Sequence, residues 1–306
     1  MNPTEDEIIR FFAGRAEPSS ASVMIGIGDD MAQVRMGRGS SVLITTDMLL
    51  AGVHFDISRA TLDQIGYKAV CVSLSDCAAM AVRPMAVVAA VAIPVSFGDV
   101  ELKQLHGGLT RATAAFGCSL VGGDITRWKR SGSLALCTTA LGRPVVGKPV
   151  MRSGARPGDR ICVTGALGGS RRSRHLEFTP RVAEAVNIAC KVPVHAMIDI
   201  SDGLSTDLTR LCRHSGVGAV VEAEAIPVSA DASDTRDPIS AALNDGEDFE
   251  LLFTLSSRSC AKLLARWTEP TPITEIGRIT DTGKIRLRRS GGVYDLPAGG
   301  YDHMSR

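Results

Sequence analysis

Residues 196–212 have the sequence AMIDISDGLSTDLTRLC, in which a short apolar run and two aspartates precede leucines at helical spacing. The apolar segment Ala196–Ile200 predicts a buried strand. From Leu204 onward the leucines recur every three or four residues, which predicts an amphipathic helix. Asp199 and Asp202 therefore lie where a strand leads into a helix, an arrangement typical of α/β proteins.

Three other apolar runs, all in the first half of the chain, also end in aspartate: residues 23–30, 42–47 and 120–124. Asp76 adds a carboxylate on the apolar face of a predicted helix. A single aspartate after a strand is most often a turn residue or a helix cap. Five such sites in one chain instead favour a shared role.

The aspartates indicate a magnesium site. A buried carboxylate is costly unless it is paired, hydrogen-bonded or bound to a metal. Hard oxygen ligands without accompanying histidine or cysteine suit Mg²⁺ better than zinc or iron. Several carboxylates around more than one Mg²⁺, beside glycine-rich turns, are what a polyphosphate substrate requires. We therefore expect a phosphoryl-transfer site.

Strands and helices alternate along the chain, which predicts an α/β or α+β fold. Helical spacing over residues 62–82 predicts a helix that Pro84 ends. Residues 142–158 are rich in Gly, Pro, Lys and Arg, so we expect a boundary between domains 1–148 and 149–306, each with its own core. Further strands are predicted at 23–27, 41–45, 86–93, 119–121, 134–141, 160–164, 219–221 and 249–255, further helices near 102–116, 181–190 and 259–267, and a hairpin near 282–296.

The composition and charge limit the kinds of partner and the compartment that we expect for this protein. The net charge is +1, so no overall field attracts nucleic acid or an anionic membrane, and we expect neither as a partner. The eight cysteines form no C-x-x-C pair and sit mostly in apolar runs, as expected of buried thiols in a reducing compartment. The N-terminus is acidic where a secretory signal would be basic. We therefore expect a soluble, cytoplasmic protein.

Short motifs follow one another from residue 28 onward. They are Gly28-Asp29-Asp30, Thr45-Thr46-Asp47, Gly52-Val53-His54-Phe55, Ser75-Asp76-Cys77-Ala78-Ala79-Met80, Gly122-Gly123-Asp124, Arg152-Ser153-Gly154-Ala155, Asp199-Ile200-Ser201-Asp202-Gly203-Leu204 and Gly246-Glu247-Asp248-Phe249-Glu250-Leu251. In this order the motifs resemble those of the thiamine-monophosphate kinases. The superfamily also contains aminoimidazole ribonucleotide synthetase, selenophosphate synthetase and a hydrogenase-maturation carbamoyl dehydratase.

The resemblance implies a two-domain fold, with an N-terminal sheet domain that forms a homodimer and a C-terminal α/β domain that closes over ATP. It also implies three groups of site residues. The residues implied for several Mg²⁺ ions are Asp30, Thr45, Thr46, Asp47, Asp76, Asp124, Asp199 and Asp202. The residues implied for ATP are His106, Gly123, Asp124, Arg152 and Ser201. The residues implied for thiamine monophosphate are His54, Glu247, Asp248 and Tyr301.

The implied reaction is a direct in-line attack by the phosphate of thiamine monophosphate on the γ-phosphorus of ATP. This nucleophile is already anionic, because the second pKa of a phosphomonoester is about 6, so no general base is expected. His106 stands where the family commonly has tyrosine, and the segment at Arg171–Arg174 is short and rich in arginine. Two alternatives stay open: another ATP-dependent enzyme of the superfamily, such as one like aminoimidazole ribonucleotide synthetase, and a non-catalytic nucleotide-binding scaffold.

Overall fold

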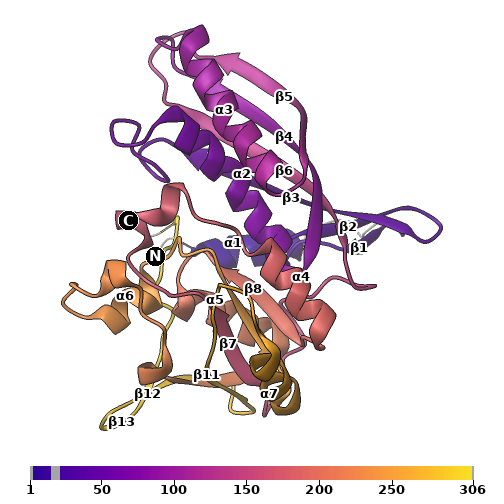
Figure 1. Ribbon diagram of the computed structural model, residues 1–306, viewed down its shortest axis with the longest axis vertical. Helices are drawn as coiled ribbons and strands as arrows, with labels where there is room; N and C mark the ends of the chain where they lie inside the picture. The colour runs from indigo at the N-terminus through magenta and orange to yellow at the C-terminus, as the bar shows by residue number, and fades with distance from the viewer. Residues whose placement is uncertain (1–2, 15–20, 305–306) are drawn as a thin grey trace.

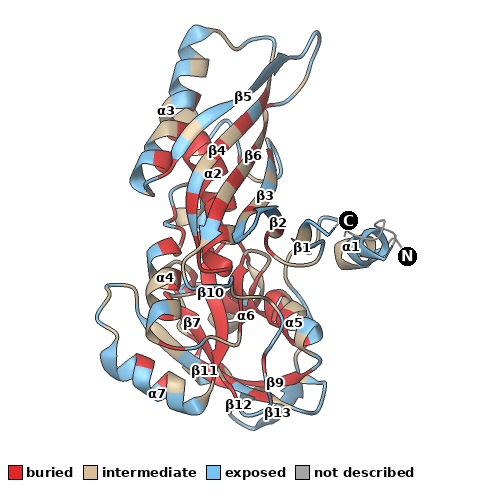
Figure 2. Ribbon diagram, turned by 90° about the vertical axis from the view of Figure 1, so that its right-hand side faces the viewer, coloured by how far each residue is buried: buried red, intermediate tan, exposed pale blue. Residues whose placement is uncertain are grey.

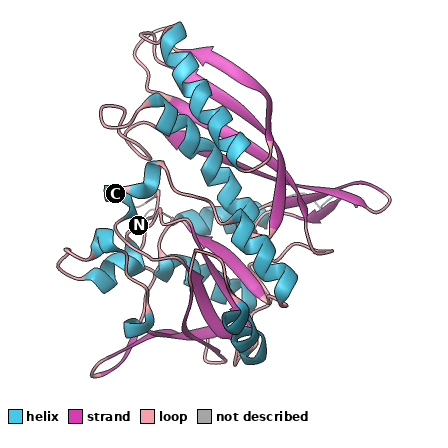
Figure 3. Cartoon of the chain, viewed as in Figure 1, coloured by secondary structure: helices cyan, strands magenta, loops and turns pink. Residues whose placement is uncertain are grey.

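The computed structural model describes residues 3–14 and 21–304 and contains two mixed sheets with helices packed on them (Figures 1 and 3). The two-domain α/β fold expected from the sequence is confirmed. The first sheet is formed within residues 23–144 and the second within residues 160–295. The connecting segment contains the expected boundary at residues 148 and 149, which stays a prediction. Among the described residues, no helix is long and apolar enough to cross a bilayer.

Within the described residues, helices cover one face of the N-terminal sheet (Figure 1). In spatial order its strands are β1 (Val23–Ile25), β2 (Ala32–Gly37), β3 (Ser40–Leu50), β6 (Ala135–Pro144), β4 (Val82–Ile93) and β5 (Ser119–Arg127). Helices α2 (Leu62–Ala79) and α3 (Asp99–Ala115) pack side by side on that face (Figure 1). They approach closely through two glycines, because a Cβ on Gly66 would lie 2.3 Å from the backbone oxygen of Leu105 and one on Gly108 would lie 1.9 Å from that of Asp63.

The C-terminal sheet is covered on both faces. Its strands, in spatial order, are β13 (Gly292–Asp295), β12 (Ile285–Arg289), β9 (Gly218–Glu222), β11 (Ile273–Thr280), β7 (Arg160–Thr164), β10 (Glu250–Leu255) and β8 (Ala196–Ile200). Alternate residues of β7 enter different apolar clusters: Ile161 packs with α5 (Leu204–Ser215) and α6 (Pro238–Asn244), whereas Cys162 packs with α4 (Val182–Lys191) and α7 (Ser257–Arg266). This alternation is the period of two expected of a strand buried on both sides.

One of the two apolar cores crosses the domain boundary, which corrects the expectation that each domain buries its own. The larger cluster joins residues of α2, such as Leu74, to Met197 of β8 and Phe253 of β10. Figure 2 shows buried residues continuing from α2 down into β7 and β10. Helix α2 also contacts α4. The C-terminal half of α2 is therefore held between the domains.

Two details near the end of α2 correct the sequence prediction. The helix ends at Ala79, and Ala81 turns the chain with a φ of 52° before β4 begins at Val82. Pro84 lies inside β4, at a register shift in its pairing with β6, where proline is tolerated because the ladder is interrupted.

Strands β2 and β11 and helix α6 were not predicted. Helix α1 (Glu5–Ala13) begins with a capping box between Thr4 and Glu7.

Candidate active site

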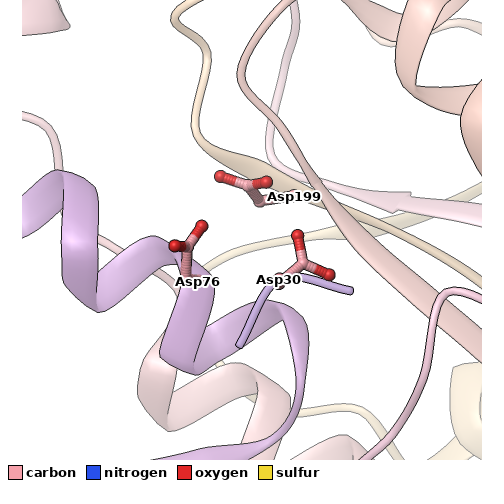
Figure 4. Close-up of side chains that lie close together, drawn as sticks. All are labelled: Asp30, Asp76 and Asp199. Atoms are coloured by element: carbon pink, nitrogen blue, oxygen red, sulfur yellow. The ribbon is translucent and has the colours of Figure 1, made fainter. Parts of the chain in front are cut away.

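Three of the predicted carboxylates meet at the junction of the domains (Figure 4). Asp30 follows β1, Asp76 lies near the end of α2, and Asp199 is in β8. Each offers an oxygen within 4.8 Å of the oxygens of the other two, and the side chains point toward one another. Asp30 and Asp199 are 6% and 4% exposed. A cluster of this spacing and oxygen chemistry fits a divalent cation such as Mg²⁺.

Hydroxyl groups hold two of these carboxylates, and the neighbouring Asp47, in place. Thr45 Oγ1 donates to the carboxylate of Asp76. Ser75 Oγ donates to Asp199 Oδ2 at 2.6 Å, and Ser73 Oγ donates to Asp47 Oδ2 at 2.7 Å. The two serines lie on α2, so this helix orients acidic side chains from both domains.

Burial and mutual repulsion make the carboxylates of this region resist ionisation. Burial, reinforced by neighbouring aspartates, raises the pKa of Asp199 to about 7 and that of Asp47 to about 6. Burial and the charges of Asp47, Asp199 and Asp30 raise the pKa of Asp76 well above its ordinary value. A bound cation would relieve this repulsion, so the electrostatics fit a metal site.

Two arginines reach the acidic region. Arg152 donates to both carboxylate oxygens of Asp30, from Nη2 at 2.7 Å and from Nε at 3.1 Å, and its backbone N–H donates to Asp29. Arg210 of α5 pairs with Asp202 and also donates to the buried Asp207 at 2.8 Å. Arg152 therefore lies beside the predicted metal ligands.

Two adjoining cavities of about 300 and 370 Å³ form one cleft. The residues that line both are Glu5, Thr46, Asp47, Ser201 and Asp202. One cavity continues to Asp30, Asp76, Asp199 and Arg152, and the other continues to His54, Glu247 and Tyr301. The structure therefore places most of the residues expected for metal, and three of the four expected for thiamine monophosphate, along one continuous cleft.

At the other end of the cleft, basic side chains surround the carboxylate of Glu247. Glu247 Oε2 lies 2.9 Å from Lys68 Nζ and 3.0 Å from His175 Nδ1. Burial alone would raise the pKa of Glu247, but these two partners and Arg171 lower it to about 2. The guanidinium of Arg171 lies 5.0 Å from the centre of the Tyr301 ring.

His54 lines the same end of the cleft. Its Nδ1 accepts from the backbone N–H of Leu50 at 3.0 Å, and its ring centre lies 5.3 Å from that of His303. Burial and the nearby positive charges lower the pKa of His54, although Glu247 opposes the shift. The histidine therefore faces the cleft as a neutral ring near neutral pH.

Asp248 is held away from the lining of the cleft. Its carboxylate accepts from the backbone N–H of Gly168 at 2.9 and 3.0 Å and from Arg174 at 2.6 Å. Arg174 also donates to the backbone oxygen of Ala166 at 2.8 Å. Arg174 and Asp248 thus anchor the turn around Gly168, whereas Arg171 lines the cleft.

Three residues expected to serve ATP or metal lie elsewhere. His106, Gly123 and Asp124 line a separate groove of about 560 Å³ at the β5 edge of the sheet, beside α3. The strand pairing runs from Asp47 through Thr138 and Ala89 to Gly123. Three steps of about 4.8 Å place the Cα atoms of Asp47 and Gly123 roughly 14 Å apart. Within a single subunit, Asp124 therefore lies apart from the cluster of Asp30, Asp76 and Asp199.

Sequence reasoning missed Lys68, His175, Arg210 and the serines of α2. Lys68 carried a signal, because it is a lysine within an apolar stretch of a helix predicted to be buried. His175 and Arg210 had none, since their partners are set by the tertiary fold.

The family models identify both halves of this fold. The N-terminal domain of the AIR synthase related proteins matches residues 28–144, and the C-terminal domain of the same family matches residues 164–290. The fold and its interdomain acidic cleft thus define an AIR synthase related protein.

Similarity to curated proteins is closer. The chain is 35% identical to the thiamine-monophosphate kinase of Rhodopirellula baltica, over 90% of this chain and 89% of the relative. It is 33% identical to that of Escherichia coli K12, over 97% of both. The solved structure of AaThiL complexed with AMPPCP and TMP matches with a TM-score of 0.84 and 28% identity, over 98% of this chain and 97% of that one. The chain belongs to the thiamine-monophosphate kinase family.

Proposed function

We propose that this protein transfers the γ-phosphoryl group of ATP to the phosphate of thiamine monophosphate, giving thiamine diphosphate and ADP. The observation that carries the proposal is the single cleft joining the cluster of Asp30, Asp76 and Asp199 to the pocket of His54, Glu247 and Tyr301. The related AaThiL was solved with TMP and with AMPPCP, an analogue of ATP. A cleft with an acidic end and a ring-lined end suits a phosphoryl donor and a small heterocyclic acceptor.

The metal ligands are proposed on the carboxylate cluster. Asp30, Asp76 and Asp199 would hold Mg²⁺ ions, with Thr45, Thr46, Asp47 and Asp202 around them. Mg²⁺ bound there would neutralise charge on the phosphates. Ser75 and Ser73 fix the carboxylates that face the ions.

The side chains have to position the substrates rather than remove a proton. The attacking phosphate is already anionic near neutral pH, because its second pKa is about 6. Arg152 and Ser201 line the acidic part of the cleft and are proposed to contact ATP. His54, Glu247 and Tyr301 are proposed to contact thiamine monophosphate, whereas Asp248 would act through the Gly168 turn. Holding the two phosphates in line would then supply most of the rate.

A homodimer accounts for Asp124 and the exposed sheet face. Asp47 points to α2, so its neighbours Met48 and Leu50 face away from the helices, where they are 59% and 38% exposed. The strand pairing Met48–Cys137–Ala90–Asp124 places Asp124 on this same face. We propose that a second copy covers the face and that Gly123 and Asp124 serve its cleft. The role of His106 beside them in ATP binding stays a prediction.

The cytoplasmic location is likewise a proposal. All eight cysteines carry free thiols, and most of them are buried. Such cysteine usage fits a reducing compartment.

An assay of the purified protein with ATP, Mg²⁺ and thiamine monophosphate tests the function. We expect thiamine diphosphate and ADP in equal amounts, resolved by chromatography, and loss of both with Asp47→Asn or Asp124→Asn. If Mg²⁺-dependent ATP binding occurs without any thiamine diphosphate, the substrate assignment is wrong. Formation of ADP with aminoimidazole-type substrates would then favour a sister enzyme, and no turnover with any of them would favour the scaffold.

A further inference from the structure

Lys68 is a charged residue in the core of α2. Its side chain is fully buried, and its neighbours Ala69 and Val70 are buried apolar residues. Burial of an ammonium group costs several kcal/mol unless hydrogen bonds replace its water, as a rough general figure. A methionine could occupy the same helix position without this cost. The presence of a lysine therefore calls for a reason beyond the stability of the helix.

The ammonium group of Lys68 joins the two domains. Its Nζ donates to the backbone oxygen of His54 at 2.7 Å, which lies in the N-terminal domain. It also donates to Glu247 Oε2 at 2.9 Å and lies 3.0 Å from His175 Nδ1, both in the C-terminal domain. One buried group thus connects both walls of the cleft at its Tyr301 end.

Glu247 depends on this arrangement. Its backbone has a φ of 55°, which is strained for a residue with a side chain, and its N–H is tied to the backbone oxygen of Ser201 at 2.6 Å. The other cation nearby, Arg171, is 3.9 Å away and 42% exposed, so water weakens its hold on the carboxylate. Lys68 and His175 both make short contacts with the Glu247 carboxylate, but Lys68 is the fully buried one of the two and also holds the loop of His54, so it fixes the direction of the Glu247 side chain relative to that loop.

We propose that Lys68 is a positioning residue for the acceptor substrate: it holds the carboxylate of Glu247 against the loop of His54, so that both line the end of the cleft that takes thiamine monophosphate. This inference rests on the proposed function. Because Lys68 does not line the cavity that contains Arg152 and the three clustered aspartates, it acts on the acceptor and not on ATP.

The test is the KM for each substrate of Lys68→Met, measured beside the control Lys103→Met. Lys103 pairs with Asp99 on the exposed face of α3 and is 75% exposed. We expect Lys68→Met to raise the KM for thiamine monophosphate about tenfold and to leave the KM for ATP within about twofold of wild type. The control should change neither. A KM for thiamine monophosphate within twofold of wild type, or an equal rise for ATP, would overturn the proposal.

Lys68→Met leaves Glu247 buried with one fewer cation and can fail to fold, so a second comparison uses Glu247→Gln and the double variant Lys68→Met/Glu247→Gln. If Lys68 acts through Glu247, the double variant should have a KM for thiamine monophosphate within about threefold of that of Glu247→Gln. A KM about tenfold higher than that of Glu247→Gln would show that Lys68 acts independently and would overturn the inference. Turnover by the wild type separates this failure from failure of the proposed function.

Discussion

The two ends of the cleft contain carboxylates in opposite electrostatic states. At one end, Asp76 and Asp199 have few positive partners, and burial and repulsion raise the pKa of Asp199 to about 7. At the other end, Glu247 is also buried but is surrounded by Lys68, His175 and Arg171, and its pKa falls to about 2. A cation from solution would relieve the repulsion at the first end, whereas at the second end the chain itself supplies the positive groups of Lys68 and Arg171. The neighbours of each carboxylate in this cleft are thus the reason for proposing one set as metal ligands and Glu247 as a substrate contact.

The largest expected effect is on turnover. It concerns the end of the cleft with the three clustered aspartates, called the metal end because we propose that it binds Mg²⁺. Asp199→Asn removes one of the three clustered carboxylates and should lower kcat/KM by about a thousandfold, because transition-state charge would lose its metal. Steady-state assays over a range of Mg²⁺ concentrations measure this. Asp295→Asn, in the exposed hairpin, is the matched control and should keep wild-type activity. Activity of Asp199→Asn within tenfold of wild type would contradict the assignment of the cluster.

The next expected effect is on stability, and it separates the two ends directly. Mg²⁺ at about 100 times its Kd should raise the free energy of unfolding by about 2.7 kcal/mol, since it binds only the folded cluster. Thermal unfolding with Mg²⁺ or EDTA measures the gain. Glu247→Gln should retain it and Asp199→Asn should lose it. If both variants lost the stabilisation by Mg²⁺ equally, Glu247 would contribute to Mg²⁺ binding as much as Asp199, and the two ends of the cleft would not act independently.

The metal end was more predictable from the sequence than the acceptor end. Asp30 follows β1, whereas Asp47 and Asp199 lie within β3 and β8, and all three belong to apolar runs that local patterns identify reliably. The pairs Lys68–Glu247 and Arg152–Asp30 join residues 179 and 122 positions apart, so they depend on how the domains pack. The place of Asp124 on the far edge strand depends on sheet order, which local periodicity does not encode. Pro84 was misjudged because a bulge accepts proline as a helix end does.

A smaller effect is expected from a residue that supports a metal ligand without joining the cluster. Ser75→Ala removes the 2.6 Å hydrogen bond to Asp199 and should weaken Mg²⁺ binding about tenfold, the lower end of what loss of such supporting bonds costs. Calorimetric titration with Mg²⁺ measures the Kd. Ser256→Ala, which removes the cap of the distant helix α7, is the control. An unchanged Kd for Ser75→Ala would mean that Asp199 needs no orientation.

The smallest expected effect is the pH dependence of the stability that the ionised Glu247 contributes. A carboxyl group with its folded pKa lowered from 4.5 to about 2 stabilises the protein above its unfolded pKa and loses this contribution as pH falls toward the folded pKa. From pH 6 to about pH 3.5 Glu247 should therefore lose about 1 kcal/mol of its contribution. Urea unfolding of wild type and Glu247→Gln, both with EDTA, isolates this loss as a narrowing of the difference between them. If the difference in free energy of unfolding between the two proteins widened on acidification, Lys68 and His175 would not hold Glu247 ionised. The proposed electrostatic contrast between the two ends of the cleft would then be wrong.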